Sequence, residues 1–288
     1  MTRAQARLRF VCAVLLYGTI GPILRFVNLP SEAVVLFRGV VGALFVLLFM
    51  RSKGMRPDVE AIRANLPALV GSGVALGLNW VFLFAAYLHT TVAIASLCNY
   101  TAPIVVIALS PVLYGERLGL KKLACVVAAV TGIALVSDLP GALSGEVNLV
   151  GVALGLAAAA AFVLIVIFNK GLHDIDAYNR VAVQLAVSAC VVLPYVLFEN
   201  HGIPLPTDAR SWFLVALLCL VQTGLAYIFY FGAMEVLPVQ ELALLGYIEP
   251  VTSVVLSALV LHEPLGIAGV VGAVLVIAAA AASELIQE

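Results

Sequence analysis

The sequence predicts an all-α polytopic membrane protein with ten transmembrane helices, arranged as two inverted five-helix repeats. Three observations predict it: an extreme apolar composition, ten apolar runs of spanning length, and an internal repeat. Of the 288 residues, 64% are hydrophobic and only 11% charged, and the mean hydropathy is +1.15. Soluble domains carry about 45–50% apolar and about 25% charged residues. That gap is too large to be buried in a soluble core, so the lipid bilayer is the expected environment.

Apolar runs close to the length that crosses a bilayer occur ten times along the chain. The first run follows Arg3, Arg7 and Arg9 but has no small-residue cleavage site after it, so we expect a retained first helix. Short connections rich in proline, glycine and charge separate the runs. The expected segments are residues 8–27, 31–50, 65–87, 91–113, 120–137, 149–169, 178–198, 211–234, 240–261 and 265–283.

The positions of lysine and arginine predict the orientation, because cytoplasmic loops carry an excess of both. With a cytoplasmic N-terminus, 12 of the 15 basic residues fall on the cytoplasmic side. The exceptions are Arg210 in an outside loop, and Arg25 and Arg38 within or at the end of helices. We therefore expect a multi-pass protein of a bacterial inner membrane with both termini in the cytoplasm.

An internal repeat is the most informative feature of the sequence. Residues 77–135 align without a gap onto 224–282, at a constant offset of 147. The matched pairs are Gly77 and Gly224, Trp80 and Tyr227, Phe84 and Phe231, Tyr100 and Tyr247, Pro103 and Pro250, and Glu116 and Glu263. The earlier helices match more loosely, with Arg25 against Lys170. The expected units are residues 1–140 and 141–288.

An offset that spans five helices, an odd number, inverts the second copy in the membrane. The charges agree, since GERLGLKK of the first copy corresponds to HEPLGIAG of the second, which keeps its glutamate and has lost its lysines. Inverted repeats of this kind are a recurrent architecture of secondary transporters, because two similar halves can alternate around one central site.

The repeated pattern resembles a known family. The stretch WVFLFAAYLHTTVAIASLCNYTAPIVVIALSPVLYGERLG and its counterpart YIFYFGAMEVLPVQELALLGYIEPVTSVVLSALVLHEPLG are similar to the repeat of the drug/metabolite transporter superfamily, in particular its ten-helix EamA-type members. The resemblance covers nearly the whole chain. It implies a bacterial inner-membrane exporter of amino acids or related metabolites, and among these the chain looks most similar to exporters of aromatic and neutral amino acids.

Pro103 and Pro250 lie at matching depth in the fourth and ninth segments. A proline cannot donate to the carbonyl four residues back, so the carbonyls of Asn99 and Gly246 are released from the helix. Within a membrane such carbonyls are tolerated where they face protein or a wet cavity. Paired interruptions therefore predict a gating kink beside a central site, with Asn99, Tyr100, Tyr247 and Glu249 around it. The alternative is a pair of packing kinks without contact to substrate.

Two charged groups lie well inside helices, Arg38 in the second segment and Glu249 in the ninth. Either would be costly against lipid, so both are expected to face the interior. They could bind the carboxylate and ammonium ends of a zwitterion, or each could be a structural hydrogen-bonding anchor.

Further candidates for binding substrate are the mid-helix residues Asn79, Trp80, Tyr227 and Tyr230, although core packing is the alternative for each. Gln184 and Gln222 are weaker candidates. Glu116 and Glu263 open the last helix of each repeat, where a carboxylate suits the positive end of the helix dipole, and we assign them to structure. The five cysteines fall in apolar runs without metal-like spacing and are expected to pack as small hydrophobic residues.

Other functions are less well supported. The chain lacks a GxxxxGK[ST] phosphate loop, HExxH and paired intramembrane aspartates, so we expect no ATP hydrolysis, no enzyme activity, no catalytic residues, no metal and no cofactor. A multidrug exporter of the small type would carry an acid in its first helix, which is absent here. A carrier of sugar phosphates or nucleotide sugars would need several membrane cations, of which only Arg25, Arg38 and Lys170 are available.

The expected partners are a small-molecule substrate, an amino acid or related zwitterion, and the lipid bilayer. The net charge of -1 leaves no basic surface for nucleic acid. We expect the chain to be able to act as a monomer. Energy coupling stays open between facilitated diffusion and a proton relay through Glu249 or Glu241.

Overall fold

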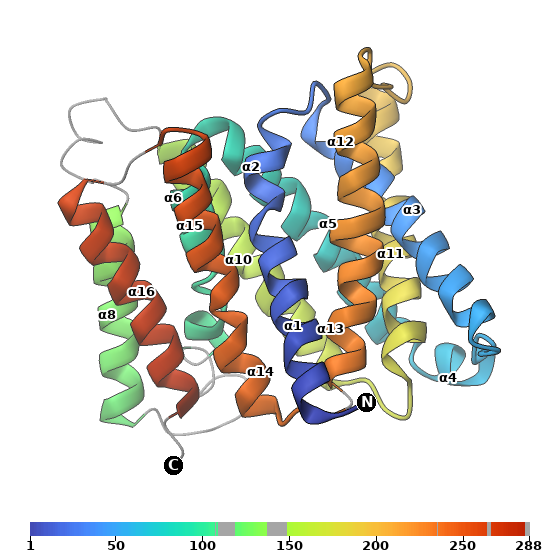
Figure 1. Ribbon diagram of the computed structural model, residues 1–288, viewed down its shortest axis with the longest axis horizontal. Helices are drawn as coiled ribbons and strands as arrows, with labels where there is room; N and C mark the ends of the chain where they lie inside the picture. The colour runs from blue at the N-terminus through green and yellow to red at the C-terminus, as the bar shows by residue number, and fades with distance from the viewer. Residues whose placement is uncertain (107, 109–118, 137–148, 235, 264–265, 286–288) are drawn as a thin grey trace.

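The structure, a computed structural model, describes residues 1–106, 108, 119–136, 149–234, 236–263 and 266–285, and within these ranges every regular element is a helix (Figure 1). Glu116, Arg117 and the end of the fourth expected segment lie outside the described residues. The helices of the first half are α1 (Arg3–Gly18), α2 (Ile20–Leu24), α3 (Ser31–Ser52), α4 (Val59–Ala64), α5 (Leu66–His89), α6 (Val92–Asn99) and α8 (Leu120–Val136). Those of the second half are α10 (Leu149–Lys170), α11 (Ala177–Glu199), α12 (Ala209–Cys219), the π-helix η1 (Leu220–Leu225), α13 (Ala226–Met234), α14 (Val239–Gly246), α15 (Ile248–Val260) and α16 (Ile267–Leu285).

The expected all-α membrane architecture is confirmed. In the part of the chain that is described, six helical stretches are long and apolar enough to cross a membrane, and four shorter apolar helices accompany them. These ten correspond one to one to the ten expected segments. One element was not expected, the short exposed helix α4, which begins after Asp58 because that side chain accepts a hydrogen bond from the Ala61 N–H at 2.9 Å.

Successive segments run in opposite directions, so that the start of α1 and the end of α16 lie at the same end of the bundle (Figure 1). The turns between α3 and α5 and between α10 and α11 lie at this end too, with Arg51, Arg63 and Lys170. We call it the basic end. A reciprocal contact joins two of its turns: Asn65 Nδ2 donates to the His173 carbonyl at 2.8 Å, and the His173 N–H donates to Asn65 Oδ1 at 2.9 Å.

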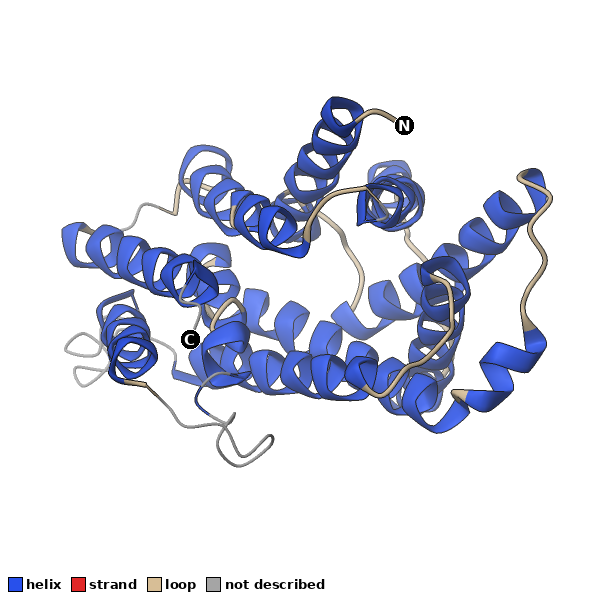
Figure 2. Ribbon diagram, turned by 90° about the horizontal axis from the view of Figure 1, so that it is seen from below, coloured by secondary structure: helices blue, strands red, loops and turns tan. Residues whose placement is uncertain are grey.

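The helices form two rows, which Figure 2 shows from the basic end. In one row α1 packs against α13, α14 and α15, and in the other α5 packs against α10 and α11, with α11 also against α3. α8 and α16 pair beside them. Large apolar side chains such as Leu48, Phe198 and Val274 point outward and are more than half exposed, as expected where lipid replaces water around the bundle.

The contact between α3 and α11 depends on the absence of a side chain at Gly39. A Cβ atom added there would lie 2.9 Å from Ala189 Cβ and 3.0 Å from the Leu185 carbonyl oxygen. Both distances are below ordinary van der Waals contact, so the two helices would have to separate.

We predict that Gly39→Ala lowers the stability of the protein by about 1–3 kcal/mol, because the added methyl group overpacks a rigid interface. Gly232→Ala is the matched control, since a Cβ there would meet Tyr178 Oη at an ordinary 3.5 Å. Thermal unfolding of the purified protein in detergent measures both. Equal melting temperatures for the two variants would contradict the prediction.

Candidate functional site

In the part of the chain that the structure describes, three spanning segments are interrupted near the middle of the bundle. The first breaks at Thr19 between α1 and α2, the fourth after α6 at Tyr100 and Thr101, and the ninth at Tyr247 between α14 and α15. In each case a proline, Pro22, Pro103 or Pro250, follows three residues after the first residue of the break.

The prolines explain the breaks. Each lacks the N–H that would bond the carbonyl four residues back, which belongs to Gly18, Asn99 or Gly246. Within the first two breaks, the hydroxyls of Thr19 and Thr101 donate to the carbonyls three residues back, those of Leu16 and Cys98, both at 2.6 Å. The residues of the breaks are thus held without a continuous helix. The break at Pro22 was missed in the sequence, although the same argument applied to TIGPIL would have found it.

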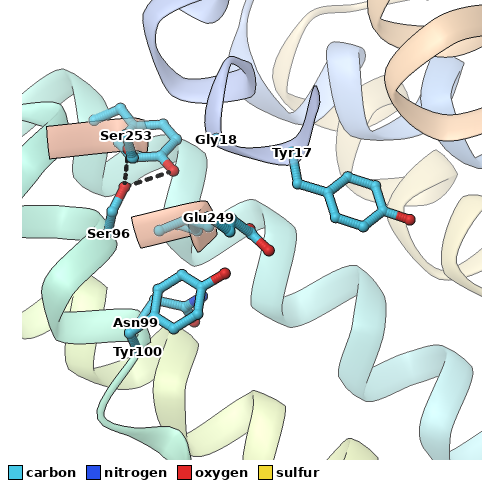
Figure 3. A pocket seen from close by; sticks show the side chains of 9 residues that line it. Tyr17, Gly18, Ser96, Asn99, Tyr100, Glu249 and Ser253 are labelled. Carbon is cyan, nitrogen blue, oxygen red and sulfur yellow. Dashed lines mark hydrogen bonds between the residues drawn. The ribbon is translucent and has the colours of Figure 1, made fainter. Parts of the chain in front are cut away.

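A small cavity lies where the interrupted helices meet (Figure 3). Its volume is about 20 Å³, room for about one water molecule. It is lined by Tyr17, Gly18, Leu83, Tyr87, Ser96, Asn99, Tyr100, Glu249 and Ser253. Three of these, Asn99, Tyr100 and Glu249, are predicted site residues. Tyr17, Gly18, Leu83, Tyr87, Ser96 and Ser253 were not predicted.

Among the described residues that line the cavity, Glu249 is the one acid. It lies in the first turn of α15, where the helix restarts in mid-bundle, so the positive end of the helix dipole is next to its carboxylate. The Tyr100 hydroxyl points towards that carboxylate (Figure 3). By the sequence offset, the position corresponding to Glu249 in the first repeat is Ala102, which is buried. The acid therefore belongs to one half only.

Serine and tyrosine hydroxyls close the cavity on the side away from the basic end. Ser96 Oγ lies 2.8 Å from Ser253 Oγ, joining α6 to α15, and 3.3 Å from Tyr87 Oη on α5 (Figure 3). These contacts connect both halves of the chain. A polar surface thus continues from Glu249 into the seam between α6 and α15.

Asn79 lies behind the cavity and positions Asn99. Its Nδ2 donates to Asn99 Oδ1 at 2.9 Å and to the Ala158 carbonyl on α10 at 2.8 Å, so it joins α5, α6 and α10. The Asn79 side chain is buried. The structure places it as a support for a lining residue.

Aromatic rings extend the site towards the basic end. Tyr17 lies with its ring centroid 5.8 Å from that of Tyr227 and 6.0 Å from that of Tyr230. Phe231 contacts both of these tyrosines. The predicted residues Tyr227 and Tyr230 are therefore connected to the cavity through Tyr17, a residue that the sequence analysis did not single out.

Arg38 and Trp80 form a separate buried group. The guanidinium carbon lies 4.1 Å from the Trp80 ring centroid and 5.3 Å from that of Phe84, and Nε donates to Thr223 Oγ1 at 2.9 Å. Among the described residues no carboxylate lies within ion-pair distance of Arg38, and neither Arg38 nor Trp80 lines the cavity. The π-helix η1 presents Thr223, whose hydroxyl donates to the Leu218 carbonyl at 2.8 Å.

The remaining candidates lie apart from the cavity. Tyr247, in the break between α14 and α15, is half-buried and packs beside the cluster of Ile104, Cys125 and Ala129. Gln184 donates to Ser72 Oγ and Asn169 Oδ1, both at 2.7 Å, in the packed interior. Gln222 donates to Thr19 Oγ1 at 3.2 Å, beside the first break.

Comparison with known proteins finds similarity to transporters. The model of the EamA-like transporter family matches residues 6–138 and again 149–283, once in each half. The chain is 23% identical over 272 residues to the uncharacterized transporter YxxF of Bacillus subtilis, covering 92% of this chain and 86% of that one. It is 29% identical over 196 residues to the pseudopaline exporter CntI of Pseudomonas aeruginosa, covering 68% and 66%. A crystal structure with 22% identity superposes with a TM-score of 0.68 over 99% of both chains and shows the same fold.

Fold, interrupted helices and relatives together define a membrane-embedded, multi-pass transporter, not an enzyme. The chain belongs to the EamA-like transporter family of the drug/metabolite transporter superfamily, as the repeated motif indicated. The finer likeness to aromatic and neutral amino acid exporters stays a prediction.

We predict that Arg38→Lys lowers the stability by about 2 kcal/mol, because an ammonium group loses both the flat stacking on Trp80 and the fixed Nε–H donor to Thr223. Arg210→Lys is the matched control, since Arg210 lies over the Phe26 ring at 4.9 Å on the exposed surface. Unfolding midpoints in detergent compare them. A larger loss for Arg210→Lys would contradict the assigned role of Arg38.

Proposed function

We propose that this transporter exports amino acids, aromatic or neutral ones, or similar small zwitterions, by alternating access. The observation that carries the proposal is Glu249, an acid in mid-bundle that lines a cavity where three interrupted helices meet. An intramembrane acid facing a cavity is a functional site by default, because its burial is costly. A carboxylate pairs with an ammonium group, which every amino acid carries.

The lining also fits the rest of such a substrate. Tyr87, Tyr100 and Tyr17 offer aromatic faces for an apolar side chain, and Ser96 and Asn99 offer hydrogen bonds for polar ends. Phosphorylated sugars fit less well, because none of the described residues that line the cavity is a lysine or an arginine. Arg38 is buried against Trp80 and does not line the cavity, so a role in binding the substrate carboxylate requires a rearrangement around Trp80.

The size of the cavity supports alternating access. A space for about one water molecule is too small for an amino acid, so substrate binding requires the helices around it to separate. The breaks next to Pro103 and Pro250 give α6 and α15 points at which to bend. We place the basic end in the cytoplasm of a bacterium, in line with the positive-inside bias, so that export runs towards the opposite end.

The test is efflux from proteoliposomes loaded with radiolabelled amino acids, with and without a pH gradient. We expect saturable release of aromatic or neutral amino acids by the wild-type protein. Acceleration by the gradient would indicate proton coupling, and an unchanged rate would indicate a facilitative carrier. No release of any amino acid from folded, inserted protein would overturn the proposal.

In this assay Glu249→Gln should reduce efflux at least about tenfold, because the amide keeps the shape of the side chain but loses the charge that pairs with the ammonium group. Glu241→Gln is the matched control. Glu241 lies on α14 at the basic end, where it pairs with Arg3 and Arg7, and its loss should leave most of the efflux. Equal activity of the two variants would remove Glu249 from the site.

Tyr100→Ala and Tyr247→Ala should each lower efflux while membrane levels stay normal, since both residues occupy breaks in the gating helices. Tyr100→Phe separates the ring from the hydroxyl that points towards Glu249 (Figure 3). Unchanged rates for both alanine variants would show that the breaks are packing features only.

A further inference from the structure

At the end of the bundle opposite the basic end, an ion pair between described residues joins the turn after α2 to the turn after α15. Arg25 Nη2, just after α2, lies 2.8 Å from Glu263 Oε1, just after α15, and donates to the Thr90 carbonyl at 2.7 Å. Glu263 Oε2 accepts from the Val92 N–H at 3.1 Å and from Ser257 Oγ at 2.7 Å. We call Arg25 and Glu263 the latch.

The contacts of Glu263 differ from those that the sequence predicted. That prediction placed its carboxylate at the start of the last helix, but α16 begins only at Ile267 and the carboxylate contacts Val92, the first residue of α6. It therefore ties the end of α15 to another helix. Arg25 also connects the turn between α5 and α6 to the ion pair, because it donates to the Thr90 carbonyl.

A buried polar stripe leads from the cavity to the latch. Glu249, Ser253 and Ser257 are spaced four residues apart and so lie on one face of α15. Ser253 and Ser257 are buried, and their hydroxyls are satisfied by Ser96 and by Glu263. A line of polar groups that runs from the cavity to one end of the bundle is what a closed translocation pathway would contain.

Helices α1 and α2 cover this stripe at two glycines. A Cβ atom on Gly18 would lie 2.6 Å from Thr252 Cβ, and one on Gly21 would lie 2.5 Å from Val92 Cγ1. The backbone therefore approaches α15 and α6 as closely as a residue without a side chain allows. The interface is closed in this structure, and Val92 and Ala93 beneath the latch are fully buried.

We propose that the seam between α6 and α15 is the half of the translocation pathway opposite the basic end, and that the Arg25–Glu263 latch holds it shut. Opening separates α2 and α15 from the turn between α5 and α6 and exposes Ser253. The inference rests on the proposed transport function and assigns gating roles to two residues outside the cavity. Arg25 and Glu263 control the opening of this half of the pathway and do not bind substrate.

The test measures access to the stripe and needs no substrate. The five cysteines are replaced by alanine and Ser253→Cys is introduced. A membrane-impermeant thiol reagent is applied from the side on which Thr207→Cys reacts, since Thr207 lies in an exposed loop at the latch end. With the latch intact, Ser253→Cys should react slowly. With Arg25→Gln or Glu263→Gln it should react about tenfold faster, because the open population rises.

Arg25→Lys should keep the slow rate, because lysine can still pair with Glu263 and donate to Thr90. Arg210→Gln is the control for the local charge, being an exposed arginine just after the Thr207 loop, and should leave the rate unchanged. Cys125, restored alone on α8 in the Arg25→Gln protein, should stay protected, because it is packed away from the seam. This last control separates gating from unfolding.

Unchanged labelling of Ser253→Cys in both the Arg25→Gln and the Glu263→Gln protein would overturn the proposal. So would an equal acceleration by Arg210→Gln, or exposure of Cys125. A protein that transports no amino acid but gains reactivity only in the latch variants would overturn the proposed substrate and leave the gate in place.

Discussion

The structure depends on one constraint: in hydrocarbon, every backbone N–H and C=O needs a partner inside the protein. Helical hydrogen bonding is interrupted at three places that come together in the fold, next to Pro22, Pro103 and Pro250. Polar side chains gather there because released carbonyls and interrupted turns are tolerated only beside other polar groups or water. Glu249, Ser96 and Asn99 are stable in mid-bundle for the same reason, and the position of the cavity follows from the positions of the prolines.

Buried polar groups also hold the rest of the bundle in one arrangement. Arg38 joins α3 to α5 and η1 through Trp80 and Thr223, and Gln184 joins α11 to α5 and α10 through Ser72 and Asn169. Neither Arg38 nor Gln184 is among the residues that line the cavity. The row formed by α3, α5, α10 and α11 is held by these buried polar contacts, whereas the seam between α6 and α15 is held by serine contacts, the latch and apolar packing of Ile94 and Leu97 with Val254. The contrast in how the two regions are held explains where movement can occur.

Much of this fold follows from the sequence, because length and hydropathy determine a spanning helix almost alone. All ten spanning segments were expected, and α3 and α10 begin at the predicted residues. The cavity was harder to predict, since which side chains meet depends on the packing of distant helices. Asn99, Tyr100 and Glu249 could be found because a repeated proline marks them. Ser96 and Ser253 carry no such signal: an isolated serine in an apolar run looks the same whether it faces a cavity or its own helix. The role of Glu263 was assigned to the wrong helix because only the fold brings Val92 beside it.

The acid at position 249 has no equivalent in the first repeat, where Ala102 occupies the matching place. The two halves share a sequence pattern but differ in their functional groups, because only the second carries the acid. If Glu249 binds the substrate, the substrate stays bound to the second repeat throughout the transport cycle and is not transferred between the two halves. The first repeat then moves relative to a substrate that stays bound to the second repeat. The inward- and outward-facing conformations of such a carrier need not have equal free energies, because the acid makes the two repeats inequivalent.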